Sequence, residues 1–293
     1  MDKEQQMKRK QEHFGHTYQR ESLSLALSMV LVSAFWILLG PFAVQLLQPF
    51  GLPYLTANAP FLAMGLGIVA ALHLLLSRSF PQLATDHSRF RLALFFRAFL
   101  AYFLTAILFL LYFFLTDPAS VDIYPAPFHK KVLMLALVVA ITPIQTSSEE
   151  VLFRILPIRI VTGKTLGVSP LHRFWASLFS ALLFALPHLG NRELAQAQSP
   201  SIVLGYYALF GFLVTYMSLE SGGFEIALAV HAANNLFVAL ICNYQGSSLP
   251  SLPLFESTRV LGTWTDLAQL CAGLIAVRFA CRSAFSSRQN PEV

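Results

Sequence analysis

Long apolar runs occupy most of this chain, and they constrain its fold more than any other feature. A helix that crosses the hydrocarbon core of a membrane needs about 20 mostly apolar residues. Eight runs of roughly this kind alternate with short polar segments, and the fifth run is the shortest. They are Leu23–Leu47, Pro53–Leu76, Leu92–Leu115, Val132–Ile158, Phe174–Leu189, Ile202–Leu219, Phe224–Cys242 and Trp264–Arg282. The sequence therefore predicts an all-α fold, a polytopic membrane bundle of about eight transmembrane helices.

Composition supports this prediction and argues against a soluble domain. Of the 293 residues, 56% are hydrophobic and 12% are charged, whereas a soluble domain carries about 25% charged residues. The net charge of +5 does not indicate a nucleic-acid partner, because the basic residues lie in short segments between apolar runs, as they do when they orient a membrane protein. We expect the lipid bilayer as a partner and no nucleic acid.

The distribution of basic residues predicts the orientation. They gather in the first 22 residues and in the segments on the same side, near residues 78–91 and 159–173, while the opposite side has few. This asymmetry predicts that both termini face the cytosol. Without an internal repeat or a low-complexity linker, we expect a basic cytoplasmic N-terminal segment over residues 1–22 and one transmembrane domain over residues 23–293.

The fourth run contains charges near its middle. Glu149, Glu150 and Arg154 follow one another within a stretch that is otherwise apolar, and a charge at the centre of a membrane helix costs at least about 2.5–3.5 kcal/mol. Glu150 and Arg154 are four residues apart and share a helix face, so they can pair. Glu149 is rotated by about 100° and lacks that partner, which suits a proton-transfer group. The alternative is a structural ion pair with an accessory glutamate.

Two other runs contribute polar side chains. His188 ends the fifth run, and His231 and Asn235 share one face of the seventh. At about 1.5 Å per residue, His231, Glu149 and Asn235 lie about 10, 14 and 16 Å from the N-terminal side, and His188 about 21 Å. We therefore expect one cavity that opens towards the cytosolic side.

This set of side chains can hydrolyse a carbonyl compound without a metal. Glu149 as base and His188 as its partner polarise a water molecule, and His231 and Asn235 donate hydrogen bonds to the oxyanion. No HExxH motif is present. A zinc-dependent version stays open, in which Glu149, His188 and His231 hold the metal and leave one position for water.

Three sequence motifs that follow one another along the chain resemble the signatures of a known family. Phe153 and the segment 222–225 also fit the pattern of that family. The motifs are Glu149-Glu150-x-x-x-Arg154, Phe184-x-x-x-His188 and His231-x-x-x-Asn235. They resemble the CPBP family, the CAAX-protease and bacteriocin-processing (Abi) intramembrane proteases, also called type II CAAX prenyl endopeptidase-like proteins. The resemblance covers about residues 132–242.

The resemblance implies an intramembrane glutamic endopeptidase without a cofactor, acting on a protein or peptide. It assigns catalysis to Glu149, His188, His231 and Asn235, with Glu150 and Arg154 in support, at a site entered from the cytosol. We expect the plasma (inner) membrane of a bacterium.

The sequence departs from the family at Ile155, where glycine is frequent, and no charged residue marks a site for a prenyl-peptide end, so CAAX cleavage itself is not indicated. The alternatives are a non-proteolytic regulatory or scaffold protein of the same family, or the zinc-dependent protease.

Overall fold

The computed structural model describes residues 3–163 and 165–286. Parts of the predicted cytoplasmic segments, namely residues 1–2, Lys164 and residues 287–293, lie outside the described residues. The chain is mostly helical, and five helical stretches are long and apolar enough to cross a membrane, which confirms a multi-pass helical membrane protein. These stretches are Gln19–Phe50, Pro53–Leu76, Leu92–Thr116, Phe128–Thr162 and Pro200–Ser221. The count of eight spans and the cytosolic location of both termini stay predictions.

The elements follow the predicted runs closely. Several membrane helices are made of an α-helix that continues through a π-helical turn. The helices are α1 (Lys3–Ala34), α2 (Gly40–Leu47), α3 (Pro53–Ala71), α4 (Phe80–Ala84), α5 (Leu92–Thr116), α6 (Phe128–Glu150), α7 (Leu156–Thr162), α8 (Pro170–His188), α9 (Arg192–Gln196), α10 (Pro200–Ser221), α11 (Glu225–Leu236), α12 (Trp264–Ala280) and α13 (Ser283–Ser286), and the strands are β1 (Val121–Ile123), β2 (Cys242–Tyr244) and β3 (Phe255–Ser257).

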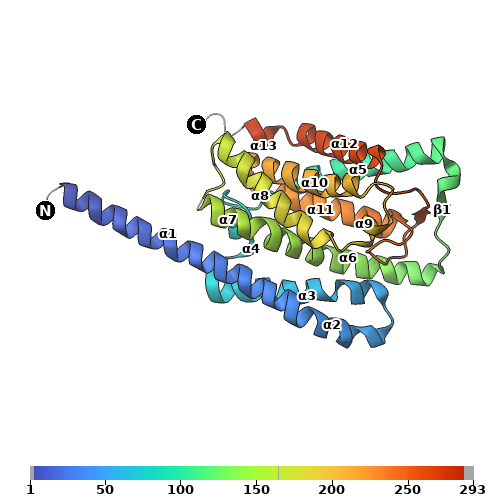
Figure 1. Cartoon of the computed structure of the whole chain (residues 1–293), viewed down its shortest axis with the longest axis horizontal. Helices are drawn as coiled ribbons and strands as arrows, with labels where there is room; N and C mark the ends of the chain where they lie inside the picture. The colour runs from blue at the N-terminus through green and yellow to red at the C-terminus, as the bar shows by residue number, and fades with distance from the viewer. Residues whose placement is uncertain (1–2, 164, 287–293) are drawn as a thin grey trace.

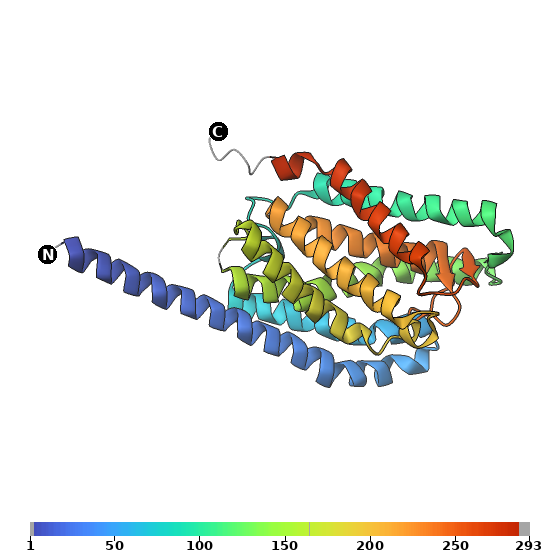
Figure 2. The same cartoon turned by 45° about the horizontal axis from the view of Figure 1, so that its top comes forward.

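The long helices pack side by side in one bundle. α1 begins and α12 ends at one end of it, while α9 and the strands lie at the other (Figure 1). The strands form a small sheet in the order β1-β3-β2, with β3 antiparallel to β1 and parallel to β2. Figure 2 shows the two orange strands, β2 and β3, at the right-hand end of the bundle, next to the end of the green α5. We call this end of the bundle the sheet end and the opposite one the α1 end.

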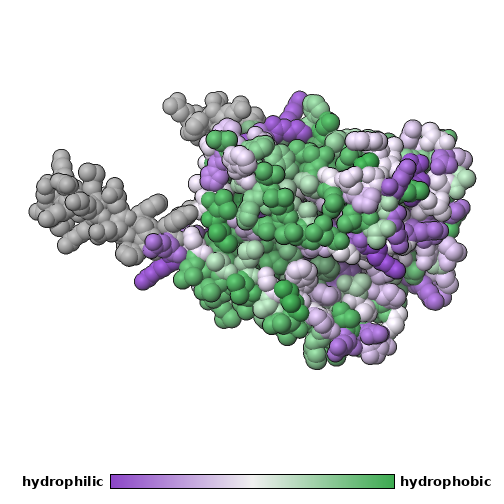
Figure 3. Space-filling model, in the orientation of Figure 1, coloured by the Kyte–Doolittle hydropathy of each residue, from purple (hydrophilic) through white to green (hydrophobic). Residues whose placement is uncertain are grey.

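The outside of the bundle is apolar, as a lipid-facing surface must be. On α5, Phe96, Leu100, Leu104 and Leu108 are exposed at every fourth position, whereas the face with Leu94, Ala98, Tyr102, Ala106 and Leu110 is buried. Residues four apart lie on the same side of a helix. Figure 3 shows apolar residues over much of the visible face, with hydrophilic residues gathered towards the sheet end.

α11 begins inside the bundle rather than at its edge. Gly222 has a positive φ of 76° and ends α10, a conformation that glycine adopts without steric cost. The segment 222–225 that follows is buried, and Glu225 at the start of α11 is fully buried. The turn that leads into the His231 helix is therefore submerged.

A π-helical turn follows the two glutamates of α6. It covers Val151–Ile155, and the N–H of Leu156 bonds to the carbonyl of Val151. Pro157 comes next and has no N–H to bond to the carbonyl four residues earlier. Such turns are frequent at functional sites, and this one lies where α6 carries its charged side chains.

Candidate active site

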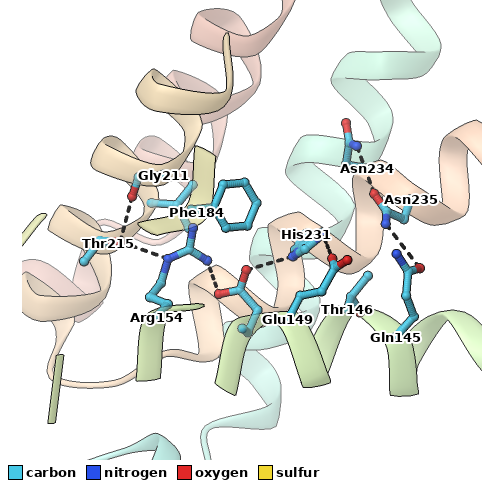
Figure 4. A network of polar contacts seen from close by, with 12 residues as sticks. Gln145, Thr146, Glu149, Arg154, Phe184, Gly211, Thr215, His231, Asn234 and Asn235 are labelled. Carbon is cyan, nitrogen blue, oxygen red and sulfur yellow. Dashed lines mark hydrogen bonds and ion pairs between the residues drawn. The ribbon is translucent and has the colours of Figure 1, made fainter. Parts of the chain in front are cut away.

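Arg154 is the centre of a fully buried polar cluster. Its side chain and that of Glu150 are both 0% exposed, and its Nη1 forms an ion pair with Glu150 Oε2. Its Nε donates to Thr215 Oγ1 of α10 at 2.9 Å, and its guanidinium lies 4.9 Å from the ring centroid of Phe184 in α8. The predicted pairing of Glu150 with Arg154 is present, and Arg154 links the π-helical turn after α6 to Phe184 of α8 and Thr215 of α10 (Figure 4).

His231 connects the two glutamates. Its Nδ1 donates to Glu150 Oε1 at 2.8 Å, and its Nε2 lies 3.1 Å from Glu149 Oε2. An ionised carboxylate accepts hydrogen bonds and cannot donate them. If both glutamates are ionised, His231 must therefore carry a proton on each nitrogen. Glu149 thus has a partner that the sequence did not indicate, because the sequence analysis paired it with water and His188.

His188 lines the same cavity as Glu149, although no direct hydrogen bond joins them. Its Nδ1 lies 2.7 Å from the carbonyl oxygen of Phe184. Since a carbonyl only accepts, Nδ1 carries the proton, and in the neutral ring Nε2 has a free lone pair. The ring also packs against Tyr207, with a centroid separation of 4.3 Å. Phe184 therefore fixes both the tautomer and the position of His188, which explains the spacing of the second motif.

Asn235 is part of an amide chain next to His231. Its Nδ2 donates to Gln145 Oε1 at 3.3 Å, and its Oδ1 accepts from Asn234 at 3.1 Å. Tyr206 of α10 donates to Asn234 Oδ1 at 3.3 Å. These contacts orient the Asn235 amide, whose second N–H has no partner among the described residues.

Glu149, His188, His231 and Asn235 line one cavity of about 280 Å³. Glu150 and Arg154 are not in its wall and lie behind it. Most of the remaining lining is aromatic, apolar or amide side chains, from α3, α6, α8, α10, α11, β2, the turn after β2 and the π turns that follow α1, α6 and α11. The structure therefore brings together the four side chains that the sequence singled out for catalysis and keeps the other two as their support.

The lining of the cavity shows towards which end of the bundle it extends, while its predicted cytosolic opening stays a prediction. Its lining includes Glu193, Ser248 and Leu249 at the sheet end and no residue from the segments that connect helices at the α1 end. The cavity therefore extends away from the side on which the sequence placed its opening.

The helix bounds place Glu149 and His188 deeper than the sequence estimate did. α6 and α7 continue to Thr162, which puts Glu149 about 20 Å from that end at about 1.5 Å per residue. α8 starts at Pro170, so that its last residue, His188, lies about 27 Å away by the same measure. His231 reaches Glu149 because α11 starts inside the bundle.

A metal ion does not fit the side chains as they are placed. No three His, Cys, Asp or Glu side chains of residues 3–163 and 165–286 form a group that could hold one. Both ring nitrogens of His231 are occupied by carboxylates, and Nδ1 of His188 by a carbonyl. Glu149, His188 and His231 therefore do not form a ligand set here.

A second buried ion pair fixes the start of the His231 helix. Arg91 donates from Nε and Nη2 to the two oxygens of Glu225, at 3.0 and 2.8 Å. Gly223 lies directly under this pair, and a Cβ on it would be 2.1 Å from Glu225 Oε2. The segment 222–225 thus shapes the entry to α11. The sequence analysis noted this segment but missed Arg91, which lies far away in the chain.

The sequence also missed Glu193, Tyr206, Tyr207 and Thr215. Glu193 and the two tyrosines line the cavity, and Thr215 holds Arg154. The serines and threonines of α10 are unremarkable in sequence, since hydroxyls in membrane helices usually bond to their own backbone. Only Glu193, a carboxylate between two apolar runs, offered a signal.

Comparison with known proteins bears on residues 127–237. This segment matches the family described as type II CAAX prenyl endopeptidase Rce1-like. The chain is also 29% identical over 210 residues to the uncharacterized protein YyaK of Bacillus subtilis (strain 168), which covers 71% of this chain and 68% of that protein. No solved structure matches the chain. The segment that holds Glu149, Arg154, His188, His231 and Asn235 is therefore a domain of the Rce1-like family of type II CAAX prenyl endopeptidases, as the three motifs predicted.

Proposed function

We propose that this chain is an intramembrane endopeptidase that hydrolyses a peptide bond with a water molecule activated by Glu149 and His188. The observation that carries the proposal is the cavity of about 280 Å³ inside a membrane bundle, lined by Glu149, His188, His231 and Asn235. Its family is one of peptidases. A peptide bond that enters this cavity meets two possible bases and two possible oxyanion donors.

Water activation falls to Glu149 and His188. Among the described residues, Glu149 has one polar partner, the His231 Nε2 group on Oε2, so its other oxygen, Oε1, can take a proton from water. The Nε2 lone pair of His188 accepts the other hydrogen of that water and orients it. The hydroxide equivalent attacks the carbonyl carbon, and the proton held by Glu149 later goes to the leaving amine.

The oxyanion is stabilised by His231 and Asn235. While Glu149 is ionised, it holds the Nε2–H of His231. Once Glu149 has taken the proton of the water, it becomes a weaker acceptor, and His231 can donate to the oxygen that gains charge. Asn235 contributes its remaining N–H. Glu150 and Arg154 keep the His231 ring in place from behind. Proton transfer from water to Glu149 in this way makes the Nε2–H of His231 available to the oxyanion.

For the membrane arrangement, we propose eight spans in the plasma membrane of a bacterium, with the α1 end in the cytosol. α8, α11 and α12 supply the three spans beyond the five longest stretches. In this orientation the cavity lies towards the outer half of the membrane.

The test compares membrane proteomes of cells with wild-type protein, Glu149→Gln and His188→Ala, read as new protein N-termini. We expect these N-termini only with the wild type. Glu220→Gln is the matched control, because its surface ion pair with Arg278 is worth about 1 kcal/mol or less. Cleavage that persists in folded Glu149→Gln would refute the proposal. A cellular phenotype that survives in both active-site variants would instead favour a regulatory or scaffold role.

A further inference from the structure

Glu193 is a buried carboxylate that borders two cavities. It lies in α9, only 6% of its residue surface is exposed, and it lines both the catalytic cavity and a second cavity of about 230 Å³. Six residues belong to both linings: Glu193, Tyr206, Tyr207, Asn234, Val238 and Tyr244. Glu193 therefore lies at the boundary between the catalytic cavity and the second cavity.

The partners of Glu193 are all neutral. Its Oε1 accepts from the Tyr244 hydroxyl at 2.6 Å and from the Ser248 N–H at 2.9 Å, and its Oε2 accepts from the Ser248 hydroxyl. No lysine, arginine or histidine of the described chain lies within ion-pair distance of it. The other buried glutamates do have such a partner: Glu149 and Glu150 contact His231, and Glu225 contacts Arg91.

The charges around the catalytic cavity are unbalanced. Its described lining contains two carboxylates, Glu149 and Glu193, and neither lysine nor arginine. A buried ionised carboxylate is costly unless it is paired as well as hydrogen-bonded. His231 can balance Glu149, but it is already shared with Glu150. Glu193 has neutral hydrogen-bond donors and no ion-pair partner among the described residues, and the arginine in the two linings, Arg259, belongs to the second cavity only.

We propose that Glu193 is a specificity-determining residue that binds a cationic group of the substrate, a lysine or arginine side chain or a free α-ammonium, close to the cleaved bond. Because the same cavity holds Glu149, a substrate whose cation reaches Glu193 presents a neighbouring peptide bond to the catalytic side chains. This inference rests on the proposed function for its peptide substrate, whereas the cation site itself does not.

Binding of peptides to the full chain in nanodiscs tests the cation site without requiring cleavage. The probes are dansyl-labelled hexapeptides that place lysine at each position in turn, each with a twin that carries norleucine instead. Norleucine keeps most of the side-chain length and removes the charge. We expect the best lysine peptide to bind the wild type at least about tenfold more tightly than its twin, which equals about 1.4 kcal/mol. In Glu193→Gln the ratio should fall to about one, while Glu220→Gln should keep it.

Two results would overturn the inference: equal binding of all twins to the wild type, or a lysine preference that Glu193→Gln retains. If Glu193→Gln does not fold, Ser248→Ala replaces it, since it frees Oε2 from a donor and should increase the preference; a decrease counts against the site. The same peptides report on cleavage. A lysine preference without Glu149-dependent cleavage would support the cation site and refute the proposed peptidase activity. Glu149-dependent cleavage without a lysine preference would support the peptidase activity and refute the cation site.

Discussion

Removing the charge of Arg154 should cost the protein much of its stability. Arg154→Met keeps an unbranched side chain but leaves the carboxylate of Glu150, which is 0% exposed, with only His231 as a basic partner, and Glu149 shares that histidine. It also removes the hydrogen bond to Thr215 and the contact with the Phe184 ring. Breaking a buried ion pair from one side costs about 3–5 kcal/mol. We expect the free energy of unfolding to decrease by that amount, a large fraction of the about 5–15 kcal/mol of a typical protein.

The double variant separates this explanation from a simple loss of packing. Glu150→Gln alone leaves Arg154 uncompensated and should also be costly, whereas Glu150→Gln with Arg154→Met leaves no unpaired charge in the cluster. The double variant should therefore be less destabilised than the sum of the single ones, with a coupling of about 1–3 kcal/mol. The measurement is unfolding by SDS in mixed micelles, followed by tryptophan fluorescence. Additive effects, or a loss below about 1 kcal/mol in Arg154→Met, would show that the buried charges are not coupled as described.

Further changes test other parts of the structure. Arg91→Ala should destabilise the protein by about 3–5 kcal/mol, because it leaves the fully buried Glu225 without its partner. Gly223→Ala should lower the thermal unfolding temperature, because its Cβ would meet Glu225 Oε2. An unchanged unfolding temperature in either variant would contradict the structural role of the Arg91–Glu225 pair. Asn235→Ala should lower kcat about 10²–10³-fold, the usual effect of losing one oxyanion donor, with little change in KM; a selective rise in KM would assign it to binding instead. A metal chelator should leave cleavage intact, and metal-dependent recovery after its removal would favour the zinc-dependent version. Gln245 at the sheet end is exposed, and Gln245→Cys in a variant without native cysteines should react with an impermeant maleimide added to intact cells. Labelling only after lysis would show that the sheet end faces the cytosol, contrary to the proposed orientation.

Sequence reasoning worked where chemistry and spacing act within one helix. The apolar runs matched helices because hydropathy over about 20 residues is a local property, and the Glu150–Arg154 pair follows from helix geometry alone. The grouping of Glu149, His188, His231 and Asn235 was predicted because polar residues are costly in a membrane and must find one another or a function.

Contacts between helices were harder to predict from the sequence. The bond between His231 and Glu149 depends on the depth at which α11 starts, and a hydropathy run does not show that its first turn is submerged. Helix bounds that differ from the hydropathy runs also changed the depths of Glu149 and His188. Arg91, Thr215 and Glu193 act on partners 51 to 134 residues away in the chain, and a single sequence carries no signal for such pairs.

The buried ion network also has a consequence for how the protein is made. α6 and the π-helical turn after it carry Glu149, Glu150 and Arg154, but Thr215 and His231, which complete their contacts, lie in α10 and α11 and are synthesised later. When the ribosome has produced only α6, the helix carries charges that lipid does not solvate. α6 therefore has to wait at the protein-lined insertion channel, or pair provisionally with earlier helices, until α10 and α11 arrive. A chain truncated after α8 should then fail to keep α6 in the bilayer. Stable membrane insertion of α6 would in this way depend on the same contacts that assemble the catalytic site.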